Sequence, residues 1–499
     1  MKKYILPAMA TAMLASSACA ANTTVSTYSA LASALGSAGN GDTITLASGT
    51  YTANETLNVS AANVTLVSAG GKSNTIIDAN SQYRILNVSG NGFKVEGITF
   101  KNAYYEGNGG AIYYTSSSVS QTTMVKNCDF IDCSAKYGGA IYAGQNSYTS
   151  FEPRENYGIV SGCTFLRCGI ATVGEEGGGG AIFGALWVEG SVFDACYCSD
   201  VSKNQYHAAI DVTSYSTVTN CIFRNHTQTK RGLVGSKEQR EQQGCSRLVD
   251  CLIANNVGHN QDDVLFHRKV ILDRCVISNN ESTVTSTFAS IYRLDASGDK
   301  SFSRITSCLF IDNKYPFRMD AMPPIVNCTF VRNVGGLVCD NVQSLNFAIT
   351  NCVFWGNIEK TEWPYGNKFK GVPGIYWHPT TPLQDFIKIG TTVVEGGTAN
   401  ADVALVLAAD VSGNSTALTA AAAADPKGAG FKDAANGDFS LKRSSVLVDA
   451  GVKADWMDSA CDIVGNRRCL KKGLVKDGAM PDIGCFEFCS IAGFKISLR

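Results

Sequence analysis

One six-residue pattern recurs along most of the chain and limits its fold more than any other feature. The pattern is Cys, any residue, Phe or Ile, two further residues, and then Asn, Cys or His, with Ser in place of the first Cys in one copy. Its copies begin between 20 and 35 residues apart and are CDFIDC (128–133), CTFLRC (163–168), SVFDAC (191–196), CIFRNH (221–226), CLIANN (251–256), CVISNN (275–280), CLFIDN (308–313), CTFVRN (328–333) and CVFWGN (352–357). Such uneven spacing indicates a solenoid, because each coil keeps its short strands and places its extra residues in loops.

The first and third places of the pattern alternate as a β-strand does, with both side chains directed inward. Parallel coils then stack Cys on Cys and Phe on Phe about 4.8 Å apart. Asn at the sixth place suits the corner after the strand, because Asn tolerates the left-handed conformation and its amide can bond to the next coil. The predicted structural ladder consists of Cys128, Cys163, Cys221, Cys251, Cys275, Cys308, Cys328, Cys352, Asn256, Asn280, Asn313, Asn333 and Asn357.

A second element supplies another corner of each coil. GGAIY occurs at 109–113 and 138–142, GGAIF at 179–183, and a degenerate copy, AAID, at 208–211. Paired glycines permit a tight turn before another inward-facing strand. The sequence therefore predicts an all-β chain whose main part is a right-handed parallel β-helix solenoid.

The alternation of GGAI with Phe, two residues and Asn resembles the repeats of polymorphic outer-membrane proteins and of the wider pectate-lyase-like β-helix superfamily. Residues 26–52, STYSALASALGSAGNGDTITLASGTYT, look like the opening of such proteins, with a short amphipathic helix capping the first coil. Residues 425–451, with CDIVGNRRC (461–469) and MPDIGCFEF (480–488), resemble the choice-of-anchor module that follows many bacterial β-helices. The resemblance implies the fold, a small C-terminal module and a location at a bacterial surface.

The chain divides into four parts on these patterns. Residues 1–20 have two lysines, a short apolar stretch and small residues before Ala21, which is typical of an export signal. We expect the β-helix to occupy 21–358, an irregular segment 359–424, and the choice-of-anchor-like module 425–499. Acylation of Cys19 is the alternative to cleavage before Ala21. No other stretch is apolar for the roughly 20 residues of a membrane helix, so the mature chain is expected outside the cell or at its surface or outer membrane.

The charge of the chain gives no reason to expect nucleic acid as a partner. Formal net charge is -1, from 42 basic and 43 acidic residues. A nucleic-acid-binding protein usually carries a clear basic excess.

Eighteen cysteines remain after the signal, and eleven of them hold the first or sixth place of the repeat. A ladder spreads thiols along a line, whereas a metal needs ligands that converge on one point, so no metal site is expected there. Parallel side chains also do not easily reach disulfide geometry, which favours packing as small apolar groups. Cys461, Cys469, Cys485 and Cys489 lie outside the ladder and are better candidates for disulfides.

The strongest catalytic candidate is GHNQDDVLFHRK, residues 258–269, which contains Asp262, Asp263, His267 and Lys269. Paired carboxylates could serve a polysaccharide hydrolase, one as the acid and one as the base. Alternatively, the two aspartates could hold Ca²⁺ while the lysine abstracts a proton from a uronic acid, as in the lyases that the fold resembles. A polar loop beside a strand has the same composition, and alternation would put the aspartates on opposite faces.

Trp355, Trp363 and Trp377 are three of the five tryptophans and fall within 23 residues of one another. Their rings could form a platform that stacks on sugars. Alternatively, they cover apolar surface at the end or side of the solenoid.

The leading hypothesis is an exported, non-catalytic β-helix at a bacterial surface that acts in adhesion or contacts a polysaccharide or a host or cell-surface glycan. It requires no cofactor. The alternative is a polysaccharide lyase or glycoside hydrolase acting on acidic polysaccharide, with Ca²⁺ only for the lyase. The two differ in whether carboxylates and a cation from successive coils converge on one face.

Overall fold

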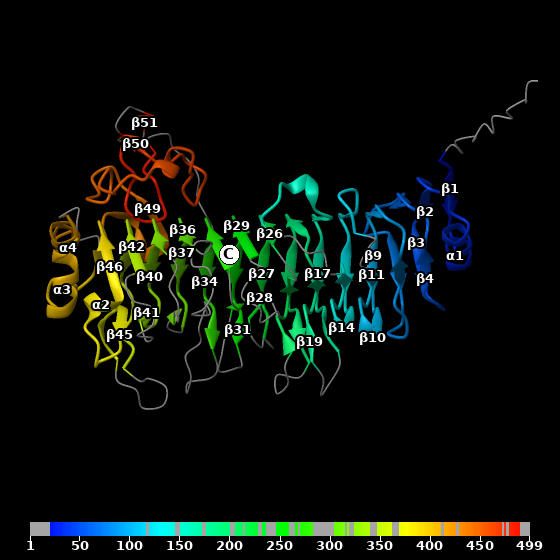
Figure 1. The fold of residues 1–499 in the computed structure, drawn as a ribbon, viewed down its shortest axis with the longest axis horizontal. Coiled ribbons are helices and arrows are strands. Elements are labelled where there is room, and N and C mark those ends of the chain that lie inside the picture. The colour runs from blue at the N-terminus through cyan, green and yellow to red at the C-terminus, as the bar shows by residue number, and fades with distance from the viewer. Residues whose placement is uncertain are drawn as a thin grey trace, which may run out of the picture.

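The repeat builds a rod of stacked coils, with the strands of successive coils side by side along its length (Figure 1). The computed structural model describes residues 20–499 apart from 116–118, 145–149, 172–175, 200–204, 213–214, 228–231, 236–245, 259–264, 268–269, 283–303, 315–316, 319–323, 340–346, 362–368, 411–413, 426–428, 472–473, 476–478 and 490–499. All strand pairs in the four largest sheets are parallel, from the first coil, where Asn22 aligns with Thr43, to the last, where Phe347 aligns with Ile387. The predicted fold class, a right-handed parallel β-helix, is confirmed.

Sheet A runs the whole length of the rod with fourteen strands. Its strands are β1 (Asn22–Val25), β2 (Thr43–Leu46), β5 (Thr65–Ser68), β8 (Lys94–Glu96), β12 (Met124–Lys126), β16 (Ile159–Ser161), β21 (Trp187–Glu189), β26 (Ser216–Thr219), β29 (Ser246–Val249), β33 (Val270–Asp273), β36 (Ile305–Thr306), β39 (Ile325–Val326), β42 (Phe347–Thr350) and β46 (Ile387–Gly390).

Sheet B follows sheet A in each coil and contains the Phe of the repeat. Its thirteen strands are β3 (Gly49–Thr52), β6 (Thr75–Asp78), β9 (Thr99–Lys101), β13 (Asp129–Ile131), β17 (Thr164–Leu166), β22 (Val192–Asp194), β27 (Ile222–Arg224), β30 (Leu252–Ala254), β34 (Val276–Ser278), β37 (Leu309–Ile311), β40 (Thr329–Val331), β43 (Val353–Trp355) and β47 (Val393–Val394).

Two shorter sheets close the coils. Sheet C consists of β4 (Leu57–Val59), β7 (Leu86–Val88), β11 (Ile112–Tyr114), β15 (Ile141–Tyr142), β20 (Ile182–Phe183), β25 (Ile210–Asp211), β28 (Val234–Gly235) and β32 (Phe266–His267). Sheet D lies between sheets B and C in the chain and consists of β10 (Tyr104–Asn108), β14 (Ser134–Tyr137), β18 (Gly169–Ile170), β19 (Gly177–Gly178), β23 (Tyr197–Cys198) and β24 (Gln205–Tyr206).

Smaller sheets complete the described strands. They are the pair β31 (Val257–Gly258) and β35 (Glu281–Ser282), the four strands β38 (Phe317–Arg318), β41 (Gly336–Cys339), β44 (Lys370–Val372) and β45 (Gly374–Trp377), and the hairpins β48 (Phe431–Asp433) with β49 (Asp438–Leu441) and β50 (Leu470–Lys471) with β51 (Leu474–Val475).

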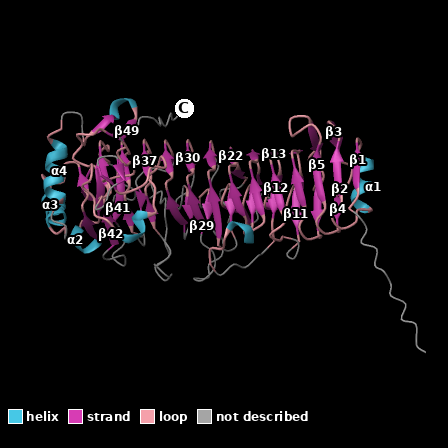
Figure 2. Cartoon of the chain, turned by 90° about the horizontal axis from the view of Figure 1, so that it is seen from above, coloured by secondary structure: helices cyan, strands magenta, loops and turns pink. Residues whose placement is uncertain are grey.

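Both ends of the rod are covered by helices (Figure 2). At the first coil, α1 (Tyr28–Gly36) begins after the N-cap Thr27 and buries Tyr28, Leu31 and Leu35, as expected for the capping helix. At the other end lie α2 (Leu383–Phe386), α3 (Ala401–Ala408) and α4 (Ser415–Ala423). Such caps keep the strand edges of the terminal coils away from solvent.

The interior consists of columns of like side chains. Phe100, Phe130, Phe165, Phe193 and Phe223 pair in register on successive strands of sheet B, with ring centroids 4.7–5.1 Å apart. The eight first-place cysteines are all buried free thiols. Cys461, Cys469, Cys485 and Cys489 are free thiols as well, so the structure does not contain the disulfides considered for the C-terminal module.

The sixth-place asparagines form a buried hydrogen-bonded column. The amide nitrogens of Asn256, Asn280, Asn313 and Asn333 each donate to the amide oxygen of the next member, over 2.9–3.1 Å, and the column ends at Asn357. The left-handed conformation falls one residue earlier than predicted, at the fifth place, on Asn255, Asn279, Asp312, Arg332 and Gly356. The fifth place turns the chain, which leaves the sixth-place side chain free to point inward.

The stack of coils continues beyond residue 358, into the segment for which the sequence suggested no regular structure. β46 and β47 are the last strands of sheets A and B. Thr392 stands there where the repeat has Cys, and its hydroxyl accepts a hydrogen bond from the backbone nitrogen of Cys352 at 3.3 Å. This substitution hides the coil from a search for the Cys pattern.

Residues of the C-terminal region pack on the outside of sheet B (Figure 1). Phe431, Phe439, Leu447 and Ile483 form one apolar cluster with the outward residues of β34, β37, β40, β43 and β47. Among the described residues, no helix is long and apolar enough to cross a membrane.

Candidate functional site

The acidic cluster singled out in the sequence cannot be assembled from the described residues. Asp262, Asp263 and Lys269 lie outside the part of the chain that the structure describes. His267 is in β32, where its backbone pairs with Gly235, but its side chain is also outside the description. The proposed catalytic roles of these residues remain predictions.

Two of the three tryptophans considered as a sugar platform, Trp355 and Trp377, lie within the described residues. Trp377 is only 1% exposed and belongs to the core, so no sugar can reach its ring. Trp355 packs against the apolar cluster beneath the C-terminal region, and Trp363 lies outside the described residues. The Trp377 ring thus packs within the apolar interior of the solenoid.

The outer surface of sheet C presents a row of side chains that the sequence analysis did not identify. Asn58, Asn87, Tyr113, Tyr142 and Phe183 occupy matching positions on β4, β7, β11, β15 and β20, and we call them the amide-aromatic row. Their neighbours in each strand point into the core. The Tyr113 and Tyr142 rings stack with centroids 5.3 Å apart, and Tyr142 and Phe183 stack at 5.2 Å. The nitrogen of the Asn87 amide donates to the Asn58 oxygen over 2.8 Å.

The paired glycines bring sheet D close to this row. At Gly109, where φ is +69°, a Cβ would lie 2.7 Å from the carbonyl oxygen of Ile112 and 2.9 Å from Cα of Tyr113. Only glycine permits this approach without strain. The corner therefore folds β10 back toward β11, so side chains of the two strands share one depression.

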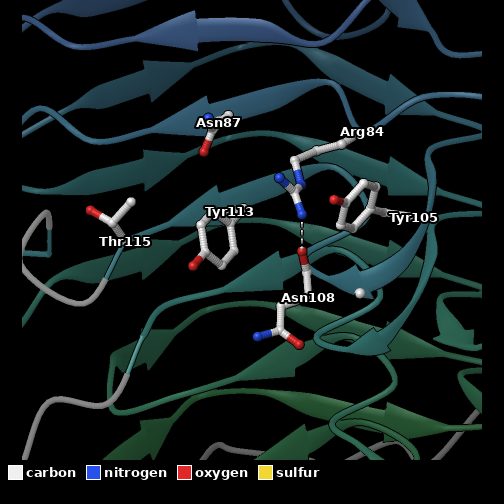
Figure 3. A pocket seen from close by; sticks show the side chains of 7 residues that line it. Arg84, Asn87, Tyr105, Asn108, Tyr113 and Thr115 are labelled. Atoms are coloured by element: carbon white, nitrogen blue, oxygen red, sulfur yellow. Dashed lines mark hydrogen bonds between the residues drawn. The ribbon is translucent and has the colours of Figure 1, made fainter.

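That depression is a solvent-open cavity of about 540 Å³ on the outside of the first coils (Figure 3). Its lining comes from β7, β10, β11 and the segments beside them, and comprises Arg84, Asn87, Tyr105, Gly107, Asn108, Tyr113 and Thr115. The volume is within the range of small-molecule sites. Tyr105 is 43% exposed, and it is one of the few large hydrophobic side chains that the described surface presents.

Arg84 holds the centre of the cavity. Its guanidinium carbon lies 3.7 Å from the ring centroid of Tyr105 and 4.6 Å from that of Tyr113. Nε donates to the carbonyl oxygen of Gly109 over 3.0 Å. Nη2 donates to the carbonyl oxygen of Asn108 over 2.7 Å, and Figure 3 shows this second bond. Burial lowers the pKa of the guanidinium, because the charged form loses water, while the nearby tyrosines act in the opposite direction. Arginine nevertheless keeps its proton in proteins.

This arrangement suits recognition of a polar ring. Aromatic side chains offer apolar rings with polar tips, the Asn87 amide both donates and accepts, and the arginine adds a fixed cation. Among the described residues, no group of three or more His, Cys, Asp or Glu is placed to hold a metal ion.

The sequence carries one signal for this cavity, a cluster of tyrosines. Tyr104, Tyr105, Tyr113 and Tyr114 flank the first GGAI element within eleven residues. Arg84 comes from the preceding coil, and only the register of the coils shows that it reaches the same place.

Comparison with known proteins gives a likeness of fold. No family model matches the chain, and no curated protein matches it. Among solved structures, a mutant of the PL6-family alginate lyase AlyGC aligns at 14% identity and a TM-score of 0.38, over 75% of this chain and 51% of its own. Pectate lyase Pel9A aligns at 13% identity and a TM-score of 0.36, over 94% of this chain and 97% of its own. A mannuronic acid-specific family 6 lyase from human gut microbiota aligns at 11% identity and a TM-score of 0.36, over 76% of this chain and 88% of its own.

The chain thus spans about half the length of AlyGC, and the shared feature is the parallel β-helix. At this level of identity the comparisons do not place a catalytic site on the chain.

Proposed function

We propose that the protein binds a polysaccharide on the outside of sheet C, as a non-catalytic β-helix exported to a bacterial surface. The cavity around Arg84 carries this proposal, because it is open and lined by the exposed Tyr105, the stacked Tyr113 and the amide of Asn87. Export rests on the N-terminal 20 residues, and the choice-of-anchor character of residues 425–499 rests on the sequence resemblance.

The row extends the proposed site in one direction. Asn58 follows Asn87 on the next coil toward the N-terminal cap, and both amides face outward. Toward the C-terminal end, Tyr142 and Phe183 fill the surface by stacking on each other. A glycan would therefore rest against Tyr113 and run over the amides, along the axis of the rod.

The test is binding of the purified mature protein to a panel of polysaccharides, measured by affinity electrophoresis. Tyr105→Ala removes an exposed ring and is expected to weaken binding about threefold to tenfold, the effect of one aromatic contact. Trp456→Ala, which removes an aromatic ring from the distant C-terminal region, is the matched control. Failure of every polysaccharide to bind, or equal loss in both variants, contradicts the proposal.

The alternative of a lyase or hydrolase acting on acidic polysaccharide is tested in the same samples. The neighbours named above are lyases, and Asp262, Asp263, His267 and Lys269 are the residues that the sequence offers for catalysis. Unsaturated products followed by ultraviolet absorbance, or new reducing ends, that disappear in Asp262→Ala or Lys269→Ala would replace the non-catalytic proposal. Binding without either product supports it.

A further inference from the structure

Arg84 differs from six other arginines of the described chain because no carboxylate neutralises it. Ion pairs with Asp or Glu are made by Arg154, Arg167, Arg224, Arg274, Arg332 and Arg468. Within the described residues, Arg84 contacts two backbone carbonyls and two tyrosine rings, and the side chain of Tyr105 also acts on it through a hydrogen bond. These partners are all uncharged.

The unpaired charge is also poorly hydrated. Arg84 is only 9% exposed. A charge that leaves water without a counter-charge costs free energy, and carbonyl dipoles and ring faces compensate it only in part. An anion in the cavity would supply the missing compensation.

The two carbonyls engage only two of the three guanidinium nitrogens. Nε and Nη2 are engaged by Gly109 and Asn108, whereas Nη1 donates to neither carbonyl. Figure 3 shows the group held between Tyr105 and Tyr113, with its remaining nitrogen turned toward the side on which Asn87 lies. The two rings and two carbonyls fix the plane of the guanidinium before any ligand arrives, which reduces the entropy cost of binding.

We infer that Arg84 binds an acidic substituent of the glycan, so that the ligand of this cavity is a polysaccharide bearing carboxylate or sulfate groups. The inference rests on the proposed function and adds the chemical class of its ligand. The neutral amides of Asn87 and Asn58 complete the site with hydrogen bonds to hydroxyl groups of neighbouring sugars. Charge recognition in the cavity then depends on one residue.

The experiment compares chemically matched glycans on the mature protein. Polygalacturonate is measured against its methyl-esterified and carboxyl-reduced forms, and dextran sulfate against carboxymethyl dextran and dextran. We expect the acidic member of a set to bind at least about tenfold more tightly than its neutral form, as for a charge-assisted hydrogen bond, and its affinity to fall as salt rises. The two sets distinguish carboxylate from sulfate.

Two variants locate the effect. Arg84→Gln keeps donors for the carbonyls but removes the charge, and it should abolish the preference for the acidic member. Asn87→Asp leaves Arg84 in place and adds a carboxylate at the cavity, so it should weaken acidic glycans selectively even if Arg84→Gln fails to fold. Arg167→Gln is the control, because it removes a surface charge that is paired with Asp132 on another face. It should leave the preference for the acidic glycan unchanged in both sets.

The outcomes separate the two proposals. Equal affinity for acidic and neutral members, or a preference that survives both cavity variants, would overturn the inference while leaving glycan binding intact. Absence of binding to any glycan would instead remove the proposed function.

Discussion

Along the sixth-place column of the repeat, a single residue separates two kinds of packing. Cys133, Cys168 and Cys196 fill the first coils, and asparagines form the hydrogen-bonded column from Asn256 onward. His226 lies between them, and its backbone nitrogen and Nδ1 both lie within 3.1 Å of the Asn256 amide oxygen. Its Nε2 is buried without a hydrogen-bond partner among the described residues. The asparagine column thus begins at a histidine that leaves one buried ring nitrogen without a hydrogen bond.

His226→Asn is expected to stabilise the fold, most clearly at acidic pH. Burial lowers the pKa of His226 from 6.5 to about 4, because the charged ring cannot be hydrated in the core. As pH falls from about 6.5 to 4, the unfolded chain takes up a proton that the folded chain refuses, so the wild type loses stability by about 3 kcal/mol. Urea unfolding at several pH values should show that the difference in unfolding free energy between the variant and the wild type grows by that amount as pH falls from about 6.5 to 4.

His378→Asn is the matched control, because His378 is partly exposed and bonds to Thr380. This variant should keep the pH dependence of the wild type. If His226→Asn and wild type keep a constant difference in stability from pH 7 to pH 4, the buried neutral imidazole is not the source of the acid sensitivity.

At the scale of elements, the C-terminal region is attached to the rod by buried polar contacts as well as by its apolar cluster. Arg468 donates to the hydroxyl of Ser307 at 3.1 Å and to the Gly484 carbonyl at 3.0 Å. Its Nη1 also lies 3.4 Å from Glu487, which accepts a hydrogen bond from the backbone of Asp482. Glu487 thus pairs with the buried Arg468, and the neighbouring buried carboxylate of Asp482 is influenced by the charges of both.

The attachment is expected to weaken as pH rises toward 8. Burial, and then repulsion by Glu487, raise the pKa of Asp482 from 3.8 to about 8. A raised pKa means that the folded chain holds a proton that the unfolded chain releases, so this stabilisation is complete below about pH 4 and is lost as pH rises through about 8. Proteolysis of the C-terminal region should therefore accelerate as pH rises from about 5 to about 8, after correction for the activity of the protease itself.

Glu487→Gln should reduce that dependence, because it removes the repulsion, although burial still acts on Asp482, and it keeps an oxygen to accept from the Asp482 nitrogen. Lys453→Gln, at the surface and paired with Asp458, is the charge control. Equal acceleration in wild type and Glu487→Gln would show that the carboxylate pair does not govern the attachment.

The same scale shows what the sequence could predict. Strands that carry the Cys, Phe and Asn places were predictable, because each place has a fixed direction relative to the core. β46 and β47 were not, because Thr392 replaces the diagnostic Cys. The cavity was not predicted either: Arg84 and Tyr113 belong to successive coils, and their proximity depends on the register and on the tight corner at Gly109. Trp377 is a different case. A cluster of tryptophans in the sequence is compatible with a sugar-binding surface, but the ring of Trp377 is buried and cannot take part in one.

For the whole molecule, the stack of coils implies that most contacts join one coil to its two neighbours. β12 pairs with β8 on one side and β16 on the other, and β13 pairs with β9 and β17 in the same way. Stability in such a solenoid is approximately the sum of the coils and of their interfaces. A complete coil is then a removable unit, whereas part of a coil is not.

Deletion of residues 124–158 removes β12 to β15, one complete coil, and is expected to leave a folded rod. Met124 aligns with both Lys94 and Ile159, so β8 and β16 can pair directly after the deletion. Phe100 then stacks on Phe165 as each did on Phe130. The variant should keep its β-sheet circular dichroism and a cooperative thermal transition, at a lower Tm because one set of interfaces is lost.

Deletion of 124–137 is the matched variant that removes β12, β13 and β14 but keeps β15. This deletion keeps β15 of sheet C but removes the strands of sheets A and B that carry the chain around the same coil. The inward and outward faces of β15 then lose the neighbouring side chains of that coil. We expect this shorter deletion to be aggregated or unfolded, although it removes fewer residues. Equal tolerance of both deletions would mean that the coil is not the unit of stability, and loss of folding in both would mean that stability is shared across the whole rod.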